Sequence, residues 1–160
     1  DQNIVNIMSM MGVKTEFVYD KVELTSIPVT EINQTLDFKN CPDLAQTVMV
    51  VAAIKGIKLT MTGLESLKIK ETDRLMAMKK ELLKIGSLLN EENGTWCLTP
   101  GTIPEHIETI ETYEDHRMAM AFAPVCMIRV VTIKDIDVVK KSYPSYWVHL
   151  KSVGIIFNEC

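Results

Sequence analysis

A repeated order of apolar helix, glycine and β-strand constrains the fold of this chain more than any other feature. Glycine just beyond a helix end readily adopts the left-handed backbone conformation that closes the last helical turn. The spacing between the copies varies, so the pattern does not indicate a solenoid. It indicates several copies of one α/β supersecondary unit. The copies are residues 4–12 followed by 13–18, 44–56 by 57–61, 74–86 by 87–89, and 146–154 by 155–157.

Two of the expected helices lack a polar face. Residues 44–54 and 118–131 are apolar almost all round, which is typical of helices that are buried on every side. Residues 74–85 are instead amphipathic, because apolar residues recur at helical spacing. In that helix Leu75, Met78, Leu82 and Ile85 are apolar, and Lys79, Lys80, Glu81 and Lys84 are polar.

No linker-like segment divides the chain, and 160 residues are enough to bury one core. We therefore expect one domain over residues 1–160, of mixed α/β (α+β) class, with repeated units around central buried helices. Further strands are expected at residues 21–25, 31–38, 95–99 and 130–133.

Two short charged strings stand where helices are expected to begin. They are residues 70–74 (KETDR) and 115–118 (DHRM). A helix start carries unpaired N–H groups and a partial positive charge, so Lys70, Arg74 and Arg117 add positive charge to places that already attract anions. The carboxylates and the histidine in the same strings can transfer protons. The combination indicates a site for an anionic substrate with acid–base chemistry.

Each of these residues also has a plainer structural interpretation. Asp43 could cap the helix that follows it, and Asp115 could cap the next buried helix. Lys70 and Arg74 are four residues apart, so on one helix they would share a face, with Glu71 as a salt-bridge partner of Arg74. His116 could be structural, and Lys141, before an expected helix start at 142–144, could be solvated.

Charge and cysteine content exclude several classes of function. A net charge of −4 argues against nucleic acid as the main partner. No apolar run is long enough to span a membrane, and no segment resembles a secretory signal. The cysteines form no CxxC pair and no zinc pattern, so a reducing, cytoplasmic setting is expected. The chain begins at Asp1 rather than at a methionine, and we expect it to be part of something longer.

Four segments of the sequence resemble one enzyme family. Residues 70–75 (KETDRL) and 115–120 (DHRMAM) are similar to two motifs of the 5-enolpyruvylshikimate-3-phosphate (EPSP) synthase family. Residues 42–47 (PDLAQT) resemble its PDxAxT segment, and residues 141–144 (KSYP) resemble its closing KT/SFP segment. The order and approximate spacing of all four segments agree with the family.

This resemblance implies a fold and a partner domain. The chain resembles the C-terminal domain of the family, one of two inverse-barrel-like domains built from three βαβαββ units around buried helices. The active site of the family lies between the two domains. The resemblance therefore implies that this chain carries one wall of a site and needs its own N-terminal domain to complete it.

The resemblance also implies a reaction. The enolpyruvyl group of phosphoenolpyruvate is transferred to the 5-hydroxyl of shikimate 3-phosphate, through a tetrahedral intermediate and with release of phosphate. This is a step in chorismate and aromatic amino-acid biosynthesis, and the family uses neither a metal nor an organic cofactor. Carbon 3 of phosphoenolpyruvate must gain a proton while the hydroxyl loses one, so an acid and a base are required.

Substrate-binding roles follow by the same resemblance for six residues, of which Asp43 also has a catalytic role. Lys70 would contact shikimate 3-phosphate, together with Ser66, which stands where the family often has asparagine. Arg74 and Arg117 would bind phosphoenolpyruvate, because the planar guanidinium group suits bidentate contacts with carboxylate and phosphate. Lys141 would lie on the phosphate side of phosphoenolpyruvate.

Catalytic roles are implied for four residues. Asp43 would accept the proton of the shikimate hydroxyl and contact shikimate 3-phosphate. Glu71 would serve as the acid–base group for the methylene carbon. Lys141 would help to protonate the leaving phosphate, and His116 would orient its neighbours, notably Glu71.

Two other classes of function remain open from the sequence. The chain could belong to an enolpyruvyl transferase with another acceptor, such as UDP-N-acetylglucosamine, although that relative lacks the combination of KETDR and DHRM. It could also be a module that binds sugar phosphates without turnover. A third alternative is a purely structural α/β domain in which the charged helix starts are caps.

Overall fold

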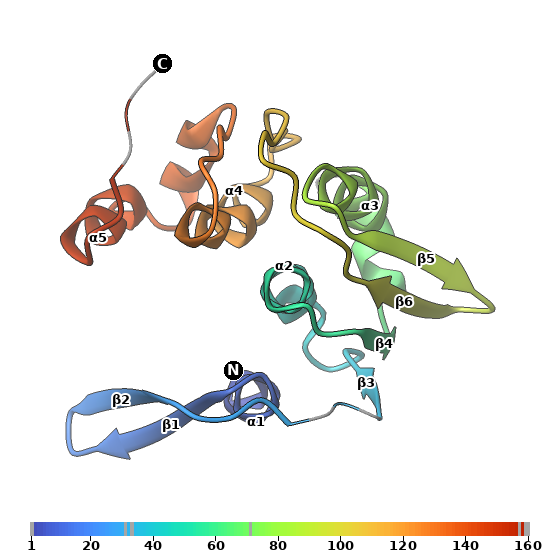
Figure 1. Ribbon diagram of the computed structural model, residues 1–160, viewed down its shortest axis with the longest axis horizontal. Helices are drawn as coiled ribbons and strands as arrows, with labels where there is room; N and C mark the ends of the chain where they lie inside the picture. Colours follow the sequence, from blue (N-terminus) through green and yellow to red (C-terminus); the bar gives the residue numbers. More distant parts are fainter. Residues whose placement is uncertain (1, 31, 33, 71, 157, 159–160) are drawn as a thin grey trace.

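The computed structural model describes residues 2–30, 32, 34–70, 72–156 and 158. Its central part is one complete βαβαββ unit with a four-stranded sheet, the kind of unit that the family resemblance implies (Figure 1). Strand β3 is parallel to β4, whereas β4 and β5 are both antiparallel to β6, in the order β3-β4-β6-β5. The unit comprises β3 (Thr35–Asp37), α2 (Ala45–Lys55), β4 (Leu59–Thr62), α3 (Arg74–Lys84), β5 (Leu88–Glu92) and β6 (Thr95–Thr99).

Helix α2 is at the centre of the core. It packs against α3, α4 and β6, so the prediction that it is buried holds for most of its surface. It is wrong for one face, where Thr47 is exposed and Val51 and Ile54 are half-buried. Figure 1 shows it between the upper helices and the α1 region. Its buried residues are Ala45, Gln46, Val48, Met49, Val50, Ala52 and Ala53. The burial explains why this helix tolerates an almost uniformly apolar sequence.

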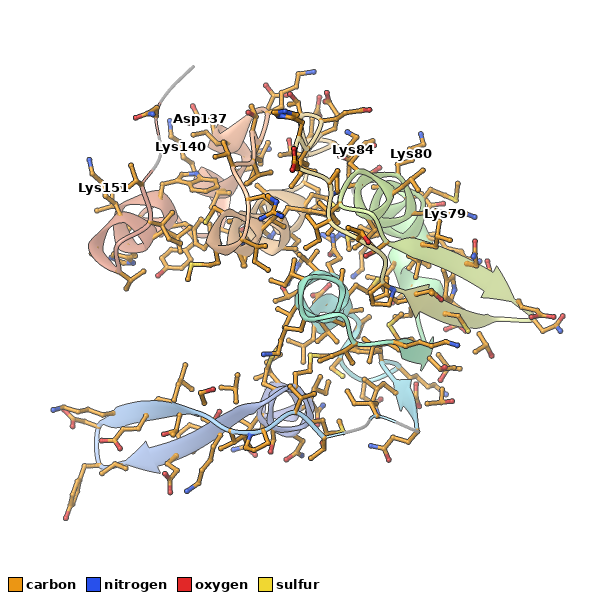
Figure 2. All side chains as sticks on the ribbon, in the orientation of Figure 1. Lys79, Lys80, Lys84, Asp137, Lys140 and Lys151 are labelled. Atoms are coloured by element: carbon orange, nitrogen blue, oxygen red, sulfur yellow. The ribbon has the colours of Figure 1, made fainter. Side chains whose placement is uncertain are left out.

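Helix α3 is amphipathic as predicted, with one exception. Asp73 caps it, since its side chain accepts a hydrogen bond of 3.1 Å from the Met76 backbone N–H. Figure 2 shows Lys79 and Lys80 on the outer surface of the helix. Glu81, expected among the polar residues, is instead fully buried. That assignment was wrong, because Glu81 has polar partners inside the protein.

The second apolar helix is shorter than predicted. α4 covers His116–Phe122 and is followed by a 3-10 segment, η3 (Ala123–Met127), rather than continuing to residue 131. Pro124 at the start of η3 has no N–H for an α-helical hydrogen bond, which accounts for the change. The strand predicted at 130–133 is also wrong, because only an isolated parallel bridge joins Ile133 to Ile110.

Three other boundaries differ from the prediction. The strand expected at 31–38 covers only Thr35–Asp37, and residues 31 and 33 lie outside the described residues. No strand is formed at 155–156 in the described part of the chain, and residue 157 lies outside it. The last helix, α5 (Tyr146–Ser152), confirms the helix expected from residue 146, whereas the helix start expected at 142–144 is wrong.

The beginning of the chain forms a separate hairpin. Helix α1 (Asn3–Met10) leads into strands β1 (Val13–Val18) and β2 (Lys21–Ser26), which form a two-stranded sheet and extend away from the four-stranded sheet (Figure 1). Phe17 and Val22 are paired across the hairpin and are both exposed. None of the described helices is both long and apolar enough to cross a membrane.

Two glycines after helices provide a matched test of packing. Gly86 and Gly56 both have left-handed backbones, with φ of +79° and +69°. A Cβ at Gly86 would overlap the carbonyl oxygen of Thr102, whereas a Cβ at Gly56 would meet no atom within 4 Å. We expect Gly56→Ala to cost about 1–2 kcal/mol of unfolding free energy, and Gly86→Ala to cost about 1–3 kcal/mol more. Urea unfolding measures both, and equal losses would contradict the close approach.

Candidate active site

Three segments that are distant in the sequence meet through their charged side chains. They are the 3-10 segment η1 (Pro42–Leu44), the start of α3 and the start of α4. The Asp43 carboxylate accepts hydrogen bonds from both guanidinium groups, at 3.1 Å from Arg74 Nη1 and 2.9 Å from Arg117 Nη2. The helix-start argument placed these residues in one site, and the structure brings them together.

Arg74 and Asp115 form the buried part of this cluster. Arg74 Nε donates to Asp115 Oδ2 at 2.6 Å, and Arg74 Nη2 donates to Asp115 Oδ1 at 3.3 Å. The Arg74 side chain is 2% exposed and the Asp115 side chain 0%. Buried charges of this kind need their partners, because each was removed from water. The ion pair therefore fixes the Arg74 guanidinium group beside Asp43.

The outer part of the cluster is accessible. The Asp43 and Arg117 side chains are 42% and 34% exposed. Arg117 also donates from Nη1 to the Asp43 backbone carbonyl at 3.4 Å. A small anion approaching this surface would meet Arg117 and Asp43 first and the buried Arg74 behind them. The cluster of Asp43, Arg74, Asp115 and Arg117 is called the arginine–aspartate cluster below.

The capping alternatives have different outcomes at the two aspartates. Asp115 does cap α4, since its Oδ1 accepts a hydrogen bond of 2.9 Å from the Arg117 backbone N–H. Capping by Asp43 is wrong, because its carboxylate bonds the two guanidinium groups and caps neither described helix next to it. The capping role that the sequence allowed for Asp43 is therefore not formed.

Lys70 and Ser66 lie on a neighbouring element. Ser66 is in the 3-10 segment η2 (Glu65–Ile69), which packs against η1, and Lys70 follows it directly with an extended backbone. Both side chains are exposed. Lys70 is therefore not on α3, and the prediction that Lys70 and Arg74 share a helix face is wrong. Glu71 lies outside the described residues.

His116 and Lys141 lie on elements that pack together. His116 is the first residue of α4, and its Nδ1 is 3.8 Å from Asp115 Oδ1. Lys141 is the last residue of the 3-10 segment η4 (Ile136–Lys141), which packs against α4, and it is exposed. Its neighbours Asp137 and Lys140 are paired at 2.7 Å on the outer surface (Figure 2).

Sequence reasoning missed the role of Asp115 beyond capping. The carboxylate is shared between the helix end and Arg74, forty-one residues away. The available signal was the aspartate directly before His116-Arg117, read together with an arginine at the other helix start. Among the described residues, no group of three or more His, Cys, Asp or Glu side chains is arranged to hold a metal ion.

The backbone immediately before Asp115 is strained. Tyr113 and Glu114 have φ of +55° and +58°, and for residues with a Cβ this region costs roughly 1–2 kcal/mol each. Asp115 N–H donates to the Thr112 carbonyl at 2.9 Å. Two central residues with positive φ and this hydrogen bond define a turn of the I′ kind, which usually contains Gly, Asn or Asp.

A tyrosine that attaches α5 to α4 provides a prediction on pH. The Tyr146 hydroxyl donates to the Met120 carbonyl at 3.1 Å, and burial raises its pKa to about 12. The folded protein therefore holds this proton to a higher pH than the unfolded chain does, so stability falls as pH rises from about 10 to 12. Urea unfolding from pH 9 to 11 should show this decline, and Tyr146→Phe should reduce its slope. An unchanged slope would contradict the assignment.

Comparison with known proteins gives the family. A family model described as EPSP synthase (3-phosphoshikimate 1-carboxyvinyltransferase) matches residues 1–150. The chain belongs to the EPSP synthase family. Similar curated proteins carry the name 3-phosphoshikimate 1-carboxyvinyltransferase. One from Bacteroides fragilis is 40% identical over 157 residues, and one from Sulfurovum sp. is 33% identical over 155 residues.

The fold agrees with the family, and the lengths differ. The structure of EPSP synthase from Acinetobacter baumannii matches 94% of this chain with a TM-score of 0.72 at 18% identity. This likeness supports a domain of the enolpyruvyl transferase fold, as predicted. The chain covers 38% of that structure, 38% of the Bacteroides relative and 36% of the Sulfurovum relative. It therefore spans little more than a third of these proteins.

Proposed function

We propose that residues 1–160 act as the C-terminal domain of a 3-phosphoshikimate 1-carboxyvinyltransferase. In this proposal an N-terminal domain supplies the other wall of the active site, and the substrates are shikimate 3-phosphate and phosphoenolpyruvate. The observation that carries the proposal is the convergence of Asp43, Arg74 and Arg117, from three segments that resemble three motifs of the family. The name shared by the relatives supports the same activity.

The arginine–aspartate cluster suits an anion that carries both carboxylate and phosphate. Arg117 and the deeper Arg74 would hold phosphoenolpyruvate through charge-assisted hydrogen bonds, with Lys141 on the phosphate side. Lys70 and Ser66, exposed beside η1, would contact shikimate 3-phosphate. Fixed cations in a partly enclosed site stabilise charge that develops on the substrate during reaction.

The proposed chemistry assigns each proton to a group. Asp43 removes the proton of the shikimate 5-hydroxyl, and the hydroxyl oxygen attacks carbon 2 of phosphoenolpyruvate. At the same time Glu71 adds a proton to carbon 3. The resulting tetrahedral intermediate then loses phosphate, which Lys141 protonates, and Glu71 takes back a proton from carbon 3. His116, beside Asp115, keeps an orienting role. We place the protein in the cytoplasm, where its three described free cysteines would remain reduced.

Acceptor specificity tests this proposal in the complete enzyme that contains these residues. Phosphate release is measured with phosphoenolpyruvate and either shikimate 3-phosphate or UDP-N-acetylglucosamine. We expect release with shikimate 3-phosphate only. Release with the nucleotide sugar would assign the other acceptor, and binding of shikimate 3-phosphate without any release would assign a module that binds sugar phosphates.

A further inference from the structure

A second polar contact joins α3 to the strained turn that precedes the arginine–aspartate cluster. Glu81 is fully buried. Its Oε1 accepts a hydrogen bond of 2.7 Å from the Tyr113 hydroxyl, and its Oε2 accepts one of 3.0 Å from the Glu111 backbone N–H. Lys84 pairs with Glu81 at 2.6 Å and donates to the Thr109 carbonyl at 2.7 Å. Apart from the Lys84–Glu81 pair within the helix, these contacts run from α3 to residues 109–113.

The contacts made by Arg74 and by Glu81 lie on one face of α3. Arg74 and Glu81 are seven residues apart, which is about two turns, so their side chains leave α3 in nearly the same direction. Arg74 bonds Asp115 at one end of the turn, and Glu81 bonds Tyr113 and Glu111 at the other end. The segment from Glu111 to Asp115 is therefore fastened to α3 on both sides of its strained residues.

Strained backbone persists only where the surroundings determine it. Tyr113 and Glu114 have left-handed backbones although neither is Gly or Asn. The Tyr113 hydroxyl remains a donor, since burial and the neighbouring Glu81 raise its pKa. On the opposite side, the Ile110 N–H and carbonyl are bonded to Thr132 and Lys134. These contacts select one conformation for a turn whose sequence does not favour it.

We infer that Glu81 is a positioning residue of the active site, which holds the Thr112–Asp115 turn so that Asp115 orients Arg74 and Arg117. The partners of Glu81 are Tyr113, the Glu111 N–H and Lys84, so it acts on the cluster through the turn. This inference rests on the proposed function for its kinetic consequence, because Arg74 and Arg117 are assigned there to phosphoenolpyruvate. Ser66 lies on η2 and Lys70 follows it directly, whereas Asp43 is held by Arg74 and Arg117. Binding of shikimate 3-phosphate should therefore depend on Glu81 much less than binding of phosphoenolpyruvate does.

The kinetic test uses the complete enzyme that contains these residues. Glu81→Leu leaves the Tyr113 hydroxyl and the Glu111 N–H without their acceptor, and we expect the KM for phosphoenolpyruvate to rise about 10–100-fold, as for small misplacements of binding groups. The KM for shikimate 3-phosphate should stay within about threefold of the wild type by the same reasoning. In Glu81→Gln the amide oxygen can accept from the Glu111 N–H while the amide nitrogen donates to the Tyr113 hydroxyl oxygen, so this variant should restore near-normal values.

Two further variants separate positioning from stability. Leu82→Ala removes a neighbouring buried side chain of α3 and should lower the melting temperature without raising the KM for phosphoenolpyruvate. Tyr113→Phe should raise that KM, and adding it to Glu81→Leu should cause little further rise, because both remove one interaction. A folded Glu81→Leu protein with an unchanged KM would overturn the inference. If Glu81→Leu does not fold, an unchanged KM for phosphoenolpyruvate in Tyr113→Phe would overturn the inference.

A spectroscopic readout keeps this test independent of the proposed function. The Arg74 Nε–Hε resonance reports the short bond to Asp115 and can be followed by NMR without substrate. We expect it to shift in Glu81→Leu and to stay in place in Leu82→Ala. If the wild type releases no phosphate, the proposed function fails while this resonance still tests the positioning role. No shift in Glu81→Leu would overturn the inference.

Discussion

Replacing Arg74 by methionine should both destabilise the protein and nearly abolish its proposed activity. The change leaves the Asp115 carboxylate buried without the guanidinium group that bonds it twice. Removing one partner of a buried ion pair typically costs about 3–5 kcal/mol. In the complete enzyme, loss of this fixed cation should lower kcat/KM for phosphoenolpyruvate by roughly 10²–10³-fold, as for other preorganised donors. Urea unfolding and phosphate release measure the two effects.

A second change at Asp115 separates these effects. Asn can still cap α4, but it leaves no buried charge when Arg74 is absent. The double variant Arg74→Met/Asp115→Asn should therefore recover much of the lost stability and none of the activity. If the double variant is as unstable as Arg74→Met, or less stable, the uncompensated Asp115 charge is not the cause of the instability. Near-normal activity in any folded Arg74→Met protein would remove Arg74 from the proposed site.

Asp43→Asn should give the opposite combination, with a large loss of activity and a small change in stability. The Asp43 side chain is 42% exposed, and exposed ion pairs contribute about 0–1 kcal/mol. If Asp43 accepts the proton of the shikimate hydroxyl, its loss should lower kcat by about 10²–10⁴-fold. Affinity for shikimate 3-phosphate should change far less than kcat, because asparagine keeps the size and hydrogen-bonding capacity of the side chain.

Asp137→Asn is the matched control for this measurement. Asp137 is also an exposed aspartate in an ion pair, with Lys140, and it lies on the outer surface of η4 (Figure 2). Its substitution should leave kcat and stability unchanged. A loss of kcat smaller than about tenfold in Asp43→Asn would contradict a general-base role, since it falls below the usual range for such groups.

The sequence predicted the outer features of the candidate site well. Helix starts are recognisable locally, because capping aspartates and a change to apolar periodicity mark them. Arg74 and Arg117 were therefore placed at helix starts correctly, and the family resemblance joined them to Asp43. The sequence alone did not predict reliably which aspartates cap a helix. Asp115 accepts the expected N–H bond, Asp73 is a cap that was not predicted, and Asp43 accepts hydrogen bonds from two guanidinium groups instead.

The buried polar contacts could not be predicted from local pattern. Glu81 lies among lysines in the sequence and reads as part of a solvated face. Its partners Glu111 and Tyr113 are about thirty residues away, so only the tertiary fold reveals them. The same holds for Arg74 and Asp115. The prediction of secondary structure failed where a single residue decided the outcome, because Pro124 ends α4 early.

The central claim is that this chain supplies one wall of a two-walled active site. The most direct test is phosphate release from phosphoenolpyruvate and shikimate 3-phosphate by residues 1–160 alone, and then by these residues mixed with the part of the Bacteroides fragilis relative that they do not match. Circular dichroism and co-sedimentation establish that both parts are folded and associated. We predict phosphate release only in the mixture. Release by residues 1–160 alone, or none from a folded and associated mixture, would contradict the claim.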